Sequence, residues 1–396
     1  MPRTAIRRAG LTAALAAVVL AGASARQAPA AQLPFAAHTI ATGLTGGYQP
    51  IVVDLNGDGR LDVIALSTQL PELVWFENPG WERHVIAAGL SRMINAAAHD
   101  IDGDGRPELA LAHRFSSTYN DSAGIVSLLT SGDDPRQPWS IREIDRVPTT
   151  HRLRWADVDG SGAMVLISAP LIGAGSLRPD FRDSLSLLWY RPGDWERRVL
   201  TDAERGVVHG IGVAPWDEPG RDAVLSASFQ GVHLHEFAGG AWSRTRLTGG
   251  DPADWPLSGA SEAQAGALGS ERFVATIEPW HGHQVVVYRQ TPDAGAAAWT
   301  RSVIDATIED GHTLVTADFD GDGRDEIVAG ERRGRQSVYL YRMVAGATDW
   351  ARQVLDDGDM GASGCAIADL NADARLDVIC IGSRTANLKW YENAGH

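Results

Sequence analysis

A short acidic motif recurs along this chain and limits the folds it can adopt more than any other feature. In residues 54–62, oxygen-bearing side chains stand at the first, third, fifth and ninth positions, and two glycines lie between them. Hard cations such as Ca²⁺ take six to eight oxygen ligands, which a sharp turn must bring together, and glycine tolerates the positive φ of such a turn. The flanks, 48–53 and 61–66, are short and β-prone, so we expect a cation loop between two strands rather than an EF-hand.

The same motif returns at three further places. The loops at 100–108 and 318–326 keep both glycines, whereas the loop at 369–377 has alanine at both positions, which resists the tight turn. A fifth stretch, 157–165, keeps only half of the pattern, because Val165 replaces the ninth-position carboxylate. We expect calcium at the four loops, with these ligands: Asp54, Asn56, Asp58 and Asp62; Asp100, Asp102, Asp104 and Glu108; Asp318, Asp320, Asp322 and Glu326; Asp369, Asn371, Asp373 and Asp377.

A motif repeated at intervals of roughly 50 residues indicates a repeat architecture. These loops resemble the FG-GAP/VCBS repeats of β-propellers, which are also found in the heads of integrin α-subunits. The resemblance extends over nearly the whole chain after the N-terminal segment and implies an all-β propeller. It says little about function, because that repeat serves many roles.

A second periodic signal sets the number of blades. A tryptophan begins a short β-prone segment in six units, and residues 35–44 match residues 81–90 position by position. The last unit has three strands before the chain reaches His396, so the N-terminal segment would complete its sheet and leave no exposed edge. We therefore expect a seven-bladed β-propeller with four-stranded blades, whose outer strands begin near Phe35, Trp81, Trp139, Trp195, Trp242, Trp299 and Trp350.

The N-terminus has the features of an export signal. Three arginines precede an apolar run at 11–20, and small residues at 23–25, or alternatively at 28–30, form a cleavage site. The pair at 7–8 also permits a twin-arginine signal, and an uncleaved anchor is an alternative, although the apolar run is short for a span. We expect a signal peptide over 1–25, with cleavage as late as 30, and one propeller domain over 26–396 in the periplasm or outside the cell.

The charge and the cysteines fit an exported binding protein or enzyme. The formal net charge of −15 disfavours nucleic acid as a partner, and no later segment is long and apolar enough to cross a membrane. We expect a monomer that binds a carbohydrate or another small polar ligand. In an oxidising compartment Cys365 and Cys380 would face each other across a hairpin and form a disulfide, the alternative being two buried free thiols.

A set of polar side chains is expected on the propeller face opposite the calcium loops. That face carries the entries into the first strand of each blade and the connections between the second and third strands. Counting from the cation loops places Gln49, Asn95, His151, Arg152, His209 and His312 at the entries, and His113, Arg114, Gln230, Trp280, His281, His283, Glu331, Arg332 and Arg384 in the connections. Arginine and glutamate could hold an anionic or hydroxylated ligand, and Trp280 could stack on a sugar ring.

Four histidines of this rim are candidates for chemistry. His209, His281, His283 and His312 could move protons near neutral pH. His281 and His283 are two residues apart and would share one side of an extended segment. With His209 or His312 they could hold a transition metal such as zinc. The alternative is that these histidines only make internal hydrogen bonds.

Two functions from different classes remain open at this stage. The segments at 75–80 and 390–395, together with the histidine-bearing rim, look similar to the propeller domain of the aldos-2-ulose dehydratase family. That resemblance implies an exported carbohydrate lyase or dehydratase, with a neutral histidine removing a proton next to a carbonyl. The alternative is a glycan- or protein-binding module for adhesion that uses the same face without turnover. Among these residues we find no nucleophile elbow, phosphate loop or dinucleotide fingerprint.

Overall fold

The computed structural model describes residues 1–2, 32–218, 220–290, 299–344 and 349–395. Contacts divide the chain after Ala31, and the unit Gln32–His396 contains every strand named below. The predicted signal segment lies almost entirely outside the described residues, apart from the first two. None of the described helices has the length and apolarity that a membrane span requires.

Seven antiparallel sheets of four strands make up the described part of this unit, and we number them as blades along the chain. Blade 1 contains β2 (Gly47–Val53), β3 (Asp62–Ser67), β4 (Leu73–Glu77) and β5 (Glu82–Ala87). Blade 2 contains β6 (Asn95–His99), β7 (Glu108–His113), β8 (Ile125–Thr130) and β9 (Ser140–Arg146), with the short 3₁₀ helix η1 (Tyr119–Asp121) before β8. Blade 3 contains β10 (Thr150–Ala156), β11 (Val165–Pro170), β12 (Ser184–Tyr190) and β13 (Arg198–Arg205).

The remaining blades follow the same order of strands. Blade 4 contains β14 (Val208–Pro215), β15 (Asp222–Ser228), β16 (Gly231–Ala238) and β17 (Ala241–Thr248). Blade 5 contains β18 (Glu262–Leu268), β19 (Glu271–Glu278), β20 (Gln284–Gln290) and β21 (Trp299–Asp305). Blade 6 contains β22 (Gly311–Ala317), β23 (Glu326–Glu331), β24 (Val338–Met343) and β25 (Trp350–Asp356). Blade 7 contains β26 (Ala362–Ala368), β27 (Asp377–Gly382), β28 (Asn387–Asn393) and β1 (Phe35–Thr42).

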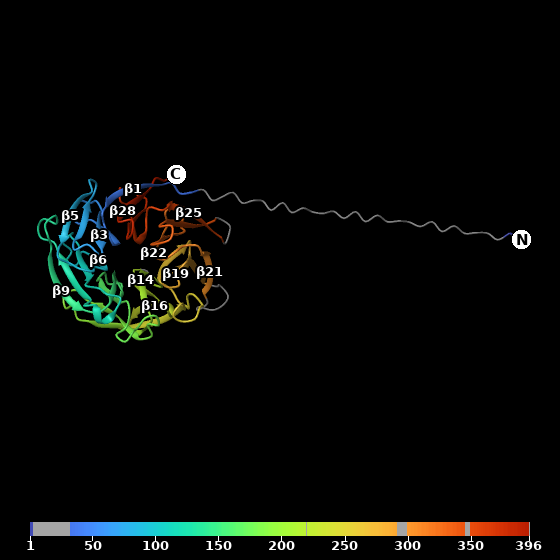
Figure 1. Ribbon diagram of the computed structural model, residues 1–396, viewed down its shortest axis with the longest axis horizontal. Helices are drawn as coiled ribbons and strands as arrows, with labels where there is room; N and C mark the ends of the chain where they lie inside the picture. The colour runs from blue at the N-terminus through green and yellow to red at the C-terminus, as the bar shows by residue number, and fades with distance from the viewer. Residues whose placement is uncertain (3–31, 219, 291–298, 345–348, 396) are drawn as a thin grey trace. The chain divides into compact units, whose positions relative to one another are not determined.

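The ring closes as the sequence predicts. Strand β1 pairs antiparallel with β28, from Phe35 opposite Asn393 to Thr42 opposite Asn387. Figure 1 shows the N-terminal strand, in blue, beside the red C-terminal strands, and the blades following one another around the ring. The pairing supplies the fourth strand of blade 7, so that β28 is not an open edge. The prediction of a seven-bladed, all-β propeller is confirmed.

Burial explains the order of strands within a blade. The second strands, such as β3 and β27, are buried along their whole length, whereas the outer strand β9 has mostly exposed side chains. Tryptophans at the outer strands contact aromatic rings of the preceding blade, for example Trp242 against Trp189 and Trp350 against Phe273, with ring centroids 6.2 and 5.7 Å apart. These large rings fill the space between neighbouring sheets, as the tryptophan periodicity indicates.

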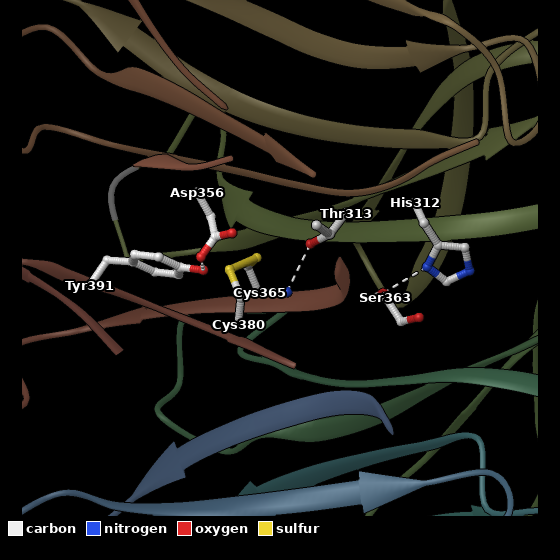
Figure 2. Close-up of a disulfide and its surroundings, with 7 residues drawn as sticks. All are labelled: His312, Thr313, Asp356, Ser363, Cys365, Cys380 and Tyr391. Atoms are coloured by element: carbon white, nitrogen blue, oxygen red, sulfur yellow. Dashed lines mark hydrogen bonds between the residues drawn. A yellow bond between two sulfur atoms is a disulfide. The ribbon is translucent and has the colours of Figure 1, made fainter. Parts of the chain in front are cut away.

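The two cysteines form the predicted disulfide. Cys365 on β26 and Cys380 on β27 are direct partners in the strand register, with their Cα atoms 4.1 Å apart. Figure 2 shows the bridge between the two strands of blade 7. The backbone N–H of Cys365 also donates to Thr313 Oγ1 at 2.8 Å, which ties blade 7 to β22 of blade 6.

Candidate functional site

The innermost strands of five blades share one irregularity, and it builds the centre of the site. In each of them the pairing register with the next strand shifts across the same position near the start of the strand. A β-bulge takes one residue out of the ladder and redirects its side chain. The residues skipped by the register are Tyr48, His151, His209, His312 and Ser363, and all five line one cavity.

This cavity has a volume of about 530 Å³, which lies in the range of small-molecule sites. His209 and His312 are buried within it, at 2% exposure each, and we call this buried part the floor. Phe115 and Trp280 contribute aromatic surface to its wall, and exposed arginines, including Arg384, stand at its mouth.

Three imidazoles from different blades meet at the floor. One ring nitrogen from each of His209, His281 and His312 lies within 4.8 Å of the other two. The Nε2 atoms of His209 and His281 are 3.0 Å apart. His209 and His312 come from bulges in β14 and β22, and His281 comes from the connection between β19 and β20. We call these three residues the histidine cluster.

An oxygen atom stands behind each imidazole of the cluster. Glu262 Oε1 lies 2.8 Å from His209 Nδ1, and Asp310 Oδ1 lies 3.5 Å from His281 Nδ1. His312 Nδ1 lies 2.6 Å from the carbonyl oxygen of Ser363, as Figure 2 shows. Carboxylate and carbonyl oxygens accept hydrogen bonds, so the short contacts of His209 and His312 favour a proton on Nδ1 and a free lone pair on Nε2 of these two rings. The same arrangement orients metal-binding histidines in proteins.

His281 also contacts a hydrogen-bond donor, and this contact bears on whether the cluster can bind a metal ion. Arg332 Nη2 lies 3.3 Å from His281 Nδ1, and a guanidinium can only donate. That contact requires the other tautomer, in which His281 Nε2–H donates to His209 Nε2. Two Nε2 lone pairs 3.0 Å apart would repel each other, so either a proton or a cation must lie between them. The donor set therefore fits a zinc-like ion with three imidazole ligands and an open position.

The histidines of the site are neutral near physiological pH. Burial, followed by the charge of Arg152, holds the pKa of His151 and of His209 well below the usual range. Burial and Arg332 do the same to the pKa of His312 and lower that of His281 to about 3. Neutral imidazoles can bind a metal or accept a proton, whereas imidazolium ions can do neither.

A second group of polar side chains lies next to the cluster. Tyr48 Oη is 2.9 Å from His151 Nε2, and His151 Nδ1 is 3.1 Å from the carbonyl oxygen of His209. That carbonyl accepts the Nδ1 proton, so His151 Nε2 is an acceptor, and both the Tyr48 hydroxyl and Arg152 Nη1, at 3.0 Å, donate to it. Arg152 Nη1 donates to Tyr48 Oη at 3.2 Å, and its Nη2 donates to Glu262 Oε1 at 3.2 Å. Tyr48 and His151 thus form a hydrogen-bonded pair that faces the cavity.

The structure brings together only part of the predicted rim. His151, His209, His281, His312, Trp280, Arg332 and Arg384 all line the cavity. His283 is exposed and is not in the cluster, because His281 has a positive φ of 49° and this segment is a turn rather than the extended strand assumed from the spacing. Among the described residues, the histidines that lie close enough together to hold a metal ion are His209, His281 and His312, without His283.

Several other predicted residues have structural contacts instead. Glu331 is fully buried and accepts the backbone N–H of Glu309 at 2.8 Å. His113 is buried against Ser127 Oγ at 3.0 Å, and Gln49 bonds to both backbone groups of Ala96 in the next blade. Arg114, Asn95 and Gln230 are likewise not among the residues lining this cavity.

Sequence reasoning missed Tyr48, Glu262 and Asp310. Tyr48 and Ser363 stand at the same place in their units as His151, His209 and His312, so aligning the entries into the first strands would have found them. Glu262 begins β18 in one of the two blades that have lost the acidic motif entirely, and Asp310 precedes β22, so counting from the acidic loops did not find either residue. Only the folded structure shows that their carboxylates lie behind the histidines.

The acidic loops lie at the other ends of the first strands and adopt the predicted turns. In the first loop, the backbone N–H groups of Gly57 and Gly59 each donate to the Asp54 carboxylate at 2.8 Å. In the last loop Ala372 and Ala374 adopt positive φ values of 59° and 67°, so this loop forms the turn although alanine is disfavoured there.

Two of these loops gather three carboxylates closely. Oxygens of Asp100, Asp102 and Glu108 lie within 4.8 Å of one another, and so do those of Asp318, Asp320 and Glu326. The first and last loops have an asparagine at the third position and so offer one carboxylate fewer. Burial, followed by the charge of Asp320, raises the pKa of Glu326 to about 8, as expected for a carboxylate without a counter-charge.

Comparison with known sequences finds two matches along the chain. Residues 123–291 match the β-propeller domain of aldos-2-ulose dehydratase, and residues 54–111 and 318–380 match FG-GAP-like repeats. The aldos-2-ulose dehydratase of Phanerodontia chrysosporium is 27% identical over 281 residues, which cover 62% of this chain. The chain spans 31% of the length of that relative. Both resemblances inferred from the sequence are thus found.

Solved structures share the architecture at low sequence identity. A hydrazine synthase chain of Kuenenia stuttgartiensis aligns with a TM-score of 0.57 at 12% identity, covering 90% of this chain and 97% of the other. The extracellular domain of a one-component system from B. thetaiotaomicron aligns with a TM-score of 0.54 at 10% identity, covering 90% of this chain and 39% of the other. At these identities the likeness concerns the fold alone.

Proposed function

We propose that this protein is a metal-dependent carbohydrate lyase of the dehydratase type, with its active site in the cavity that holds the histidine cluster. One observation carries the proposal: three neutral imidazoles, each backed by an oxygen acceptor, converge at the floor of a ligand-sized cavity. The similarity to an aldos-2-ulose dehydratase supports a keto-sugar as the substrate class. A purely structural histidine cluster would not need an open cavity above it.

The cluster would hold a zinc-like ion through His209, His281 and His312. Such an ion, when bound, supplies Lewis acidity that polarises a sugar carbonyl and acidifies the neighbouring C–H bond. The Ser363 carbonyl and Glu262 contact the Nδ1 atoms of His312 and His209, and Arg332, which is paired with Asp310, contacts Nδ1 of His281.

The proton transfer falls to Tyr48 and His151. The Tyr48 hydroxyl donates to His151 Nε2, so the phenol can pass its proton to the imidazole while its oxygen takes a proton from the carbon next to the carbonyl. Arg152 donates to the same oxygen and stabilises negative charge on it. The pair then returns a proton to the hydroxyl leaving from the adjacent carbon. One C–H and one C–O bond break, a C=C bond forms, and water departs.

Metal analysis and two histidine variants test this function. Elemental analysis of the purified protein should find one zinc-like ion that His209→Ala and His312→Ala lose. Incubation with an aldos-2-ulose should give a conjugated enone absorbing in the ultraviolet, and each variant should lower this rate by about a hundredfold or more. His38→Ala, an exposed histidine on β1 bonded to Glu392, is the matched control and should keep both properties.

Two results would contradict the proposal. One is a wild-type protein that binds no transition metal after loading with zinc. The other is undiminished turnover in either variant. A glycan that binds the cavity without any turnover would favour the non-catalytic binding function instead. Melting curves of both variants show whether the fold survives.

We also propose calcium in the acidic loops and export of the chain. The two trios of close carboxylates support calcium, because their mutual repulsion needs a cation and oxygen ligands suit a hard one. The disulfide supports an oxidising compartment. Calcium is tested by elemental analysis after dialysis, and export by fractionating the producing cells. A calcium content of zero after loading, or protein confined to the reducing cytosol, would contradict these two proposals.

A further inference from the structure

The cavity differs in charge from the rest of the molecule. The chain carries a net charge of −15. Yet the lining residues that the structure describes include five arginines and four histidines, and neither aspartate nor glutamate is among them. The arginines are Arg92, Arg178, Arg332, Arg333 and Arg384. A concave surface with one sign of charge concentrates ligands of the opposite sign.

These arginines have little internal compensation. Arg332 and Arg333 share a single carboxylate, Asp310, at 3.0 and 3.1 Å. Among the described residues, no carboxylate lies within ion-pair distance of Arg92, Arg178 or Arg384. By contrast, Arg146 on the outer strand β9 has an ion-pair partner, Glu143, at 2.6 Å. A guanidinium group stays protonated at any physiological pH, so these arginines carry a fixed positive charge at the mouth of the cavity.

The arginines at the mouth come from the connections of several blades. Arg92 precedes β6, Arg178 lies between β11 and β12, and Arg384 lies between β27 and β28. Arg92 has a positive φ of 48°, a conformation that is costly for arginine and occurs where the surrounding structure requires it. Its backbone is held by the N–H of Phe115, which donates to the Arg92 carbonyl oxygen at 3.1 Å.

The histidines and the arginines lie at different depths of the cavity and can recognise different groups of one ligand. The histidine cluster is at the buried floor, and Arg92, Arg333 and Arg384 are exposed at the mouth. A sugar whose carbonyl reaches the floor therefore presents its far end to guanidinium groups. Guanidinium binds carboxylate, phosphate and sulfate oxygens through paired N–H donors, whereas a neutral hydroxyl gains much less from its charge.

We propose that the ligand of this cavity is an anionic sugar, carrying an oxyanion group that Arg92, Arg178 and Arg384 hold at the mouth. The inference rests on the proposed function for the identity of the ligand as a sugar. The charge itself follows from the cavity. The oxyanion can be the carboxylate of a sugar acid or a phosphate or sulfate ester, because all three share the same chemistry toward guanidinium.

Matched pairs of sugars that differ only in charge test this proposal. Zinc-loaded protein is titrated by calorimetry with D-glucuronate and D-galacturonate, and then with their neutral methyl esters. At least one acid should bind about tenfold tighter than its ester or better, and the difference should shrink as salt rises from about 50 to about 500 mM. Glucose 6-phosphate and glucose 6-sulfate, each compared with glucose, show whether an ester anion is preferred over a carboxylate.

Two variants connect the preference to the arginines. Arg384→Glu and Arg92→Glu should each weaken binding of the preferred anion by about tenfold or more and leave the neutral partner within about twofold. Arg146→Glu, at an exposed position on β9, makes the same change in net charge and should have no such effect. If a charge reversal lowers the melting temperature, Arg384→Gln replaces it, because that change removes the charge alone.

The proposal is overturned if charged and neutral partners bind equally, if neither carboxylates, phosphate nor sulfate bind, or if the arginine variants keep the full preference. Each of these results leaves the metal and the lyase activity standing, because zinc content and enone formation are measured separately. Conversely, a protein that binds no zinc but still prefers anionic sugars would contradict the lyase proposal and support the proposal of an anionic ligand.

Discussion

Strand β22 has a candidate metal site at each end, and the two sites are built in opposite ways. At its start, His312 meets His209 and His281, which lie 103 and 31 residues earlier in the chain. Just after its end, Asp318 begins a loop whose ligands fall within nine residues. The acidic loop is a local feature, and each loop forms its own turn. The histidine cluster exists only when blades 4, 5 and 6 stand next to one another in the ring.

This difference predicts which structural changes each of the two sites should tolerate. Local loops depend on their own sequence, as the last loop shows by forming its turn with alanines. The cluster depends on ring closure, on the bulges of the first strands and on groups such as Glu262 from a different blade. Perturbing the ring should therefore affect the histidine cluster before it affects the loops.

The largest effect is expected from opening the ring. Deleting residues 32–42 removes β1 and exposes the edge of β28. We expect soluble protein to be lost or the melting temperature to fall by about 10 °C or more. Calorimetry of the purified deletion variant checks this. A melting curve equal to that of the full chain would show that the closing strand is dispensable and that the contrast between the sites does not depend on the ring.

The second-largest effect is a difference in zinc affinity between variants of two neighbouring histidines. His281→Ala should lower zinc affinity by about a hundredfold or more, whereas His283→Ala should change it by less than about threefold, because only His281 points into the cluster. Competition with a fluorescent zinc chelator measures both constants. Equal losses in the two variants would favour the ligand set expected from the spacing over the set that the structure assembles.

A smaller effect is expected from the group behind His209. Glu262→Gln keeps the shape of the side chain but removes the carboxylate that lies 2.8 Å from His209 Nδ1 and pairs with Arg152. Zinc affinity should fall by about ten- to a hundredfold, with some loss of stability because Arg152 would lose a buried partner. Chelator competition and a melting curve report the two effects. Unchanged zinc affinity would mean that the ring of His209 is held without this contact.

The smallest effect concerns the acidic loops. Removing calcium with a chelator should lower the melting temperature by a few degrees, and Glu326→Gln should reduce that response, since it removes one carboxylate of the trio that ends in Glu326. Residual zinc binding after calcium removal should stay within about threefold of wild type if the two sites are independent. A collapse of zinc binding on calcium removal would show instead that the loops hold the histidine cluster in place.

Much of this protein could be predicted because its pattern is repeated. The acidic motif, the tryptophan periodicity and the match of residues 35–44 to 81–90 together define blades and ring closure, and a repeat allows each unit to confirm the others. The disulfide followed because Cys365 and Cys380 are placed symmetrically about one loop. The rim residues were identified as a group from their offsets, including three of the histidines that meet at the floor.

Which rim residues work together was decided by the tertiary structure. The extended geometry assumed for His281 and His283 failed because a left-handed residue turns the backbone there. Glu262 and Asp310 gained their roles through contacts across blades, which no local spacing encodes. The bulges that direct Tyr48, His151, His209, His312 and Ser363 inward depend on pairing with the next strand. Local sequence thus determined the strands, turns and acidic loops, because their interactions lie within one unit. The cavity forms only when the seven units close into a ring, because the residues that line it lie on different blades.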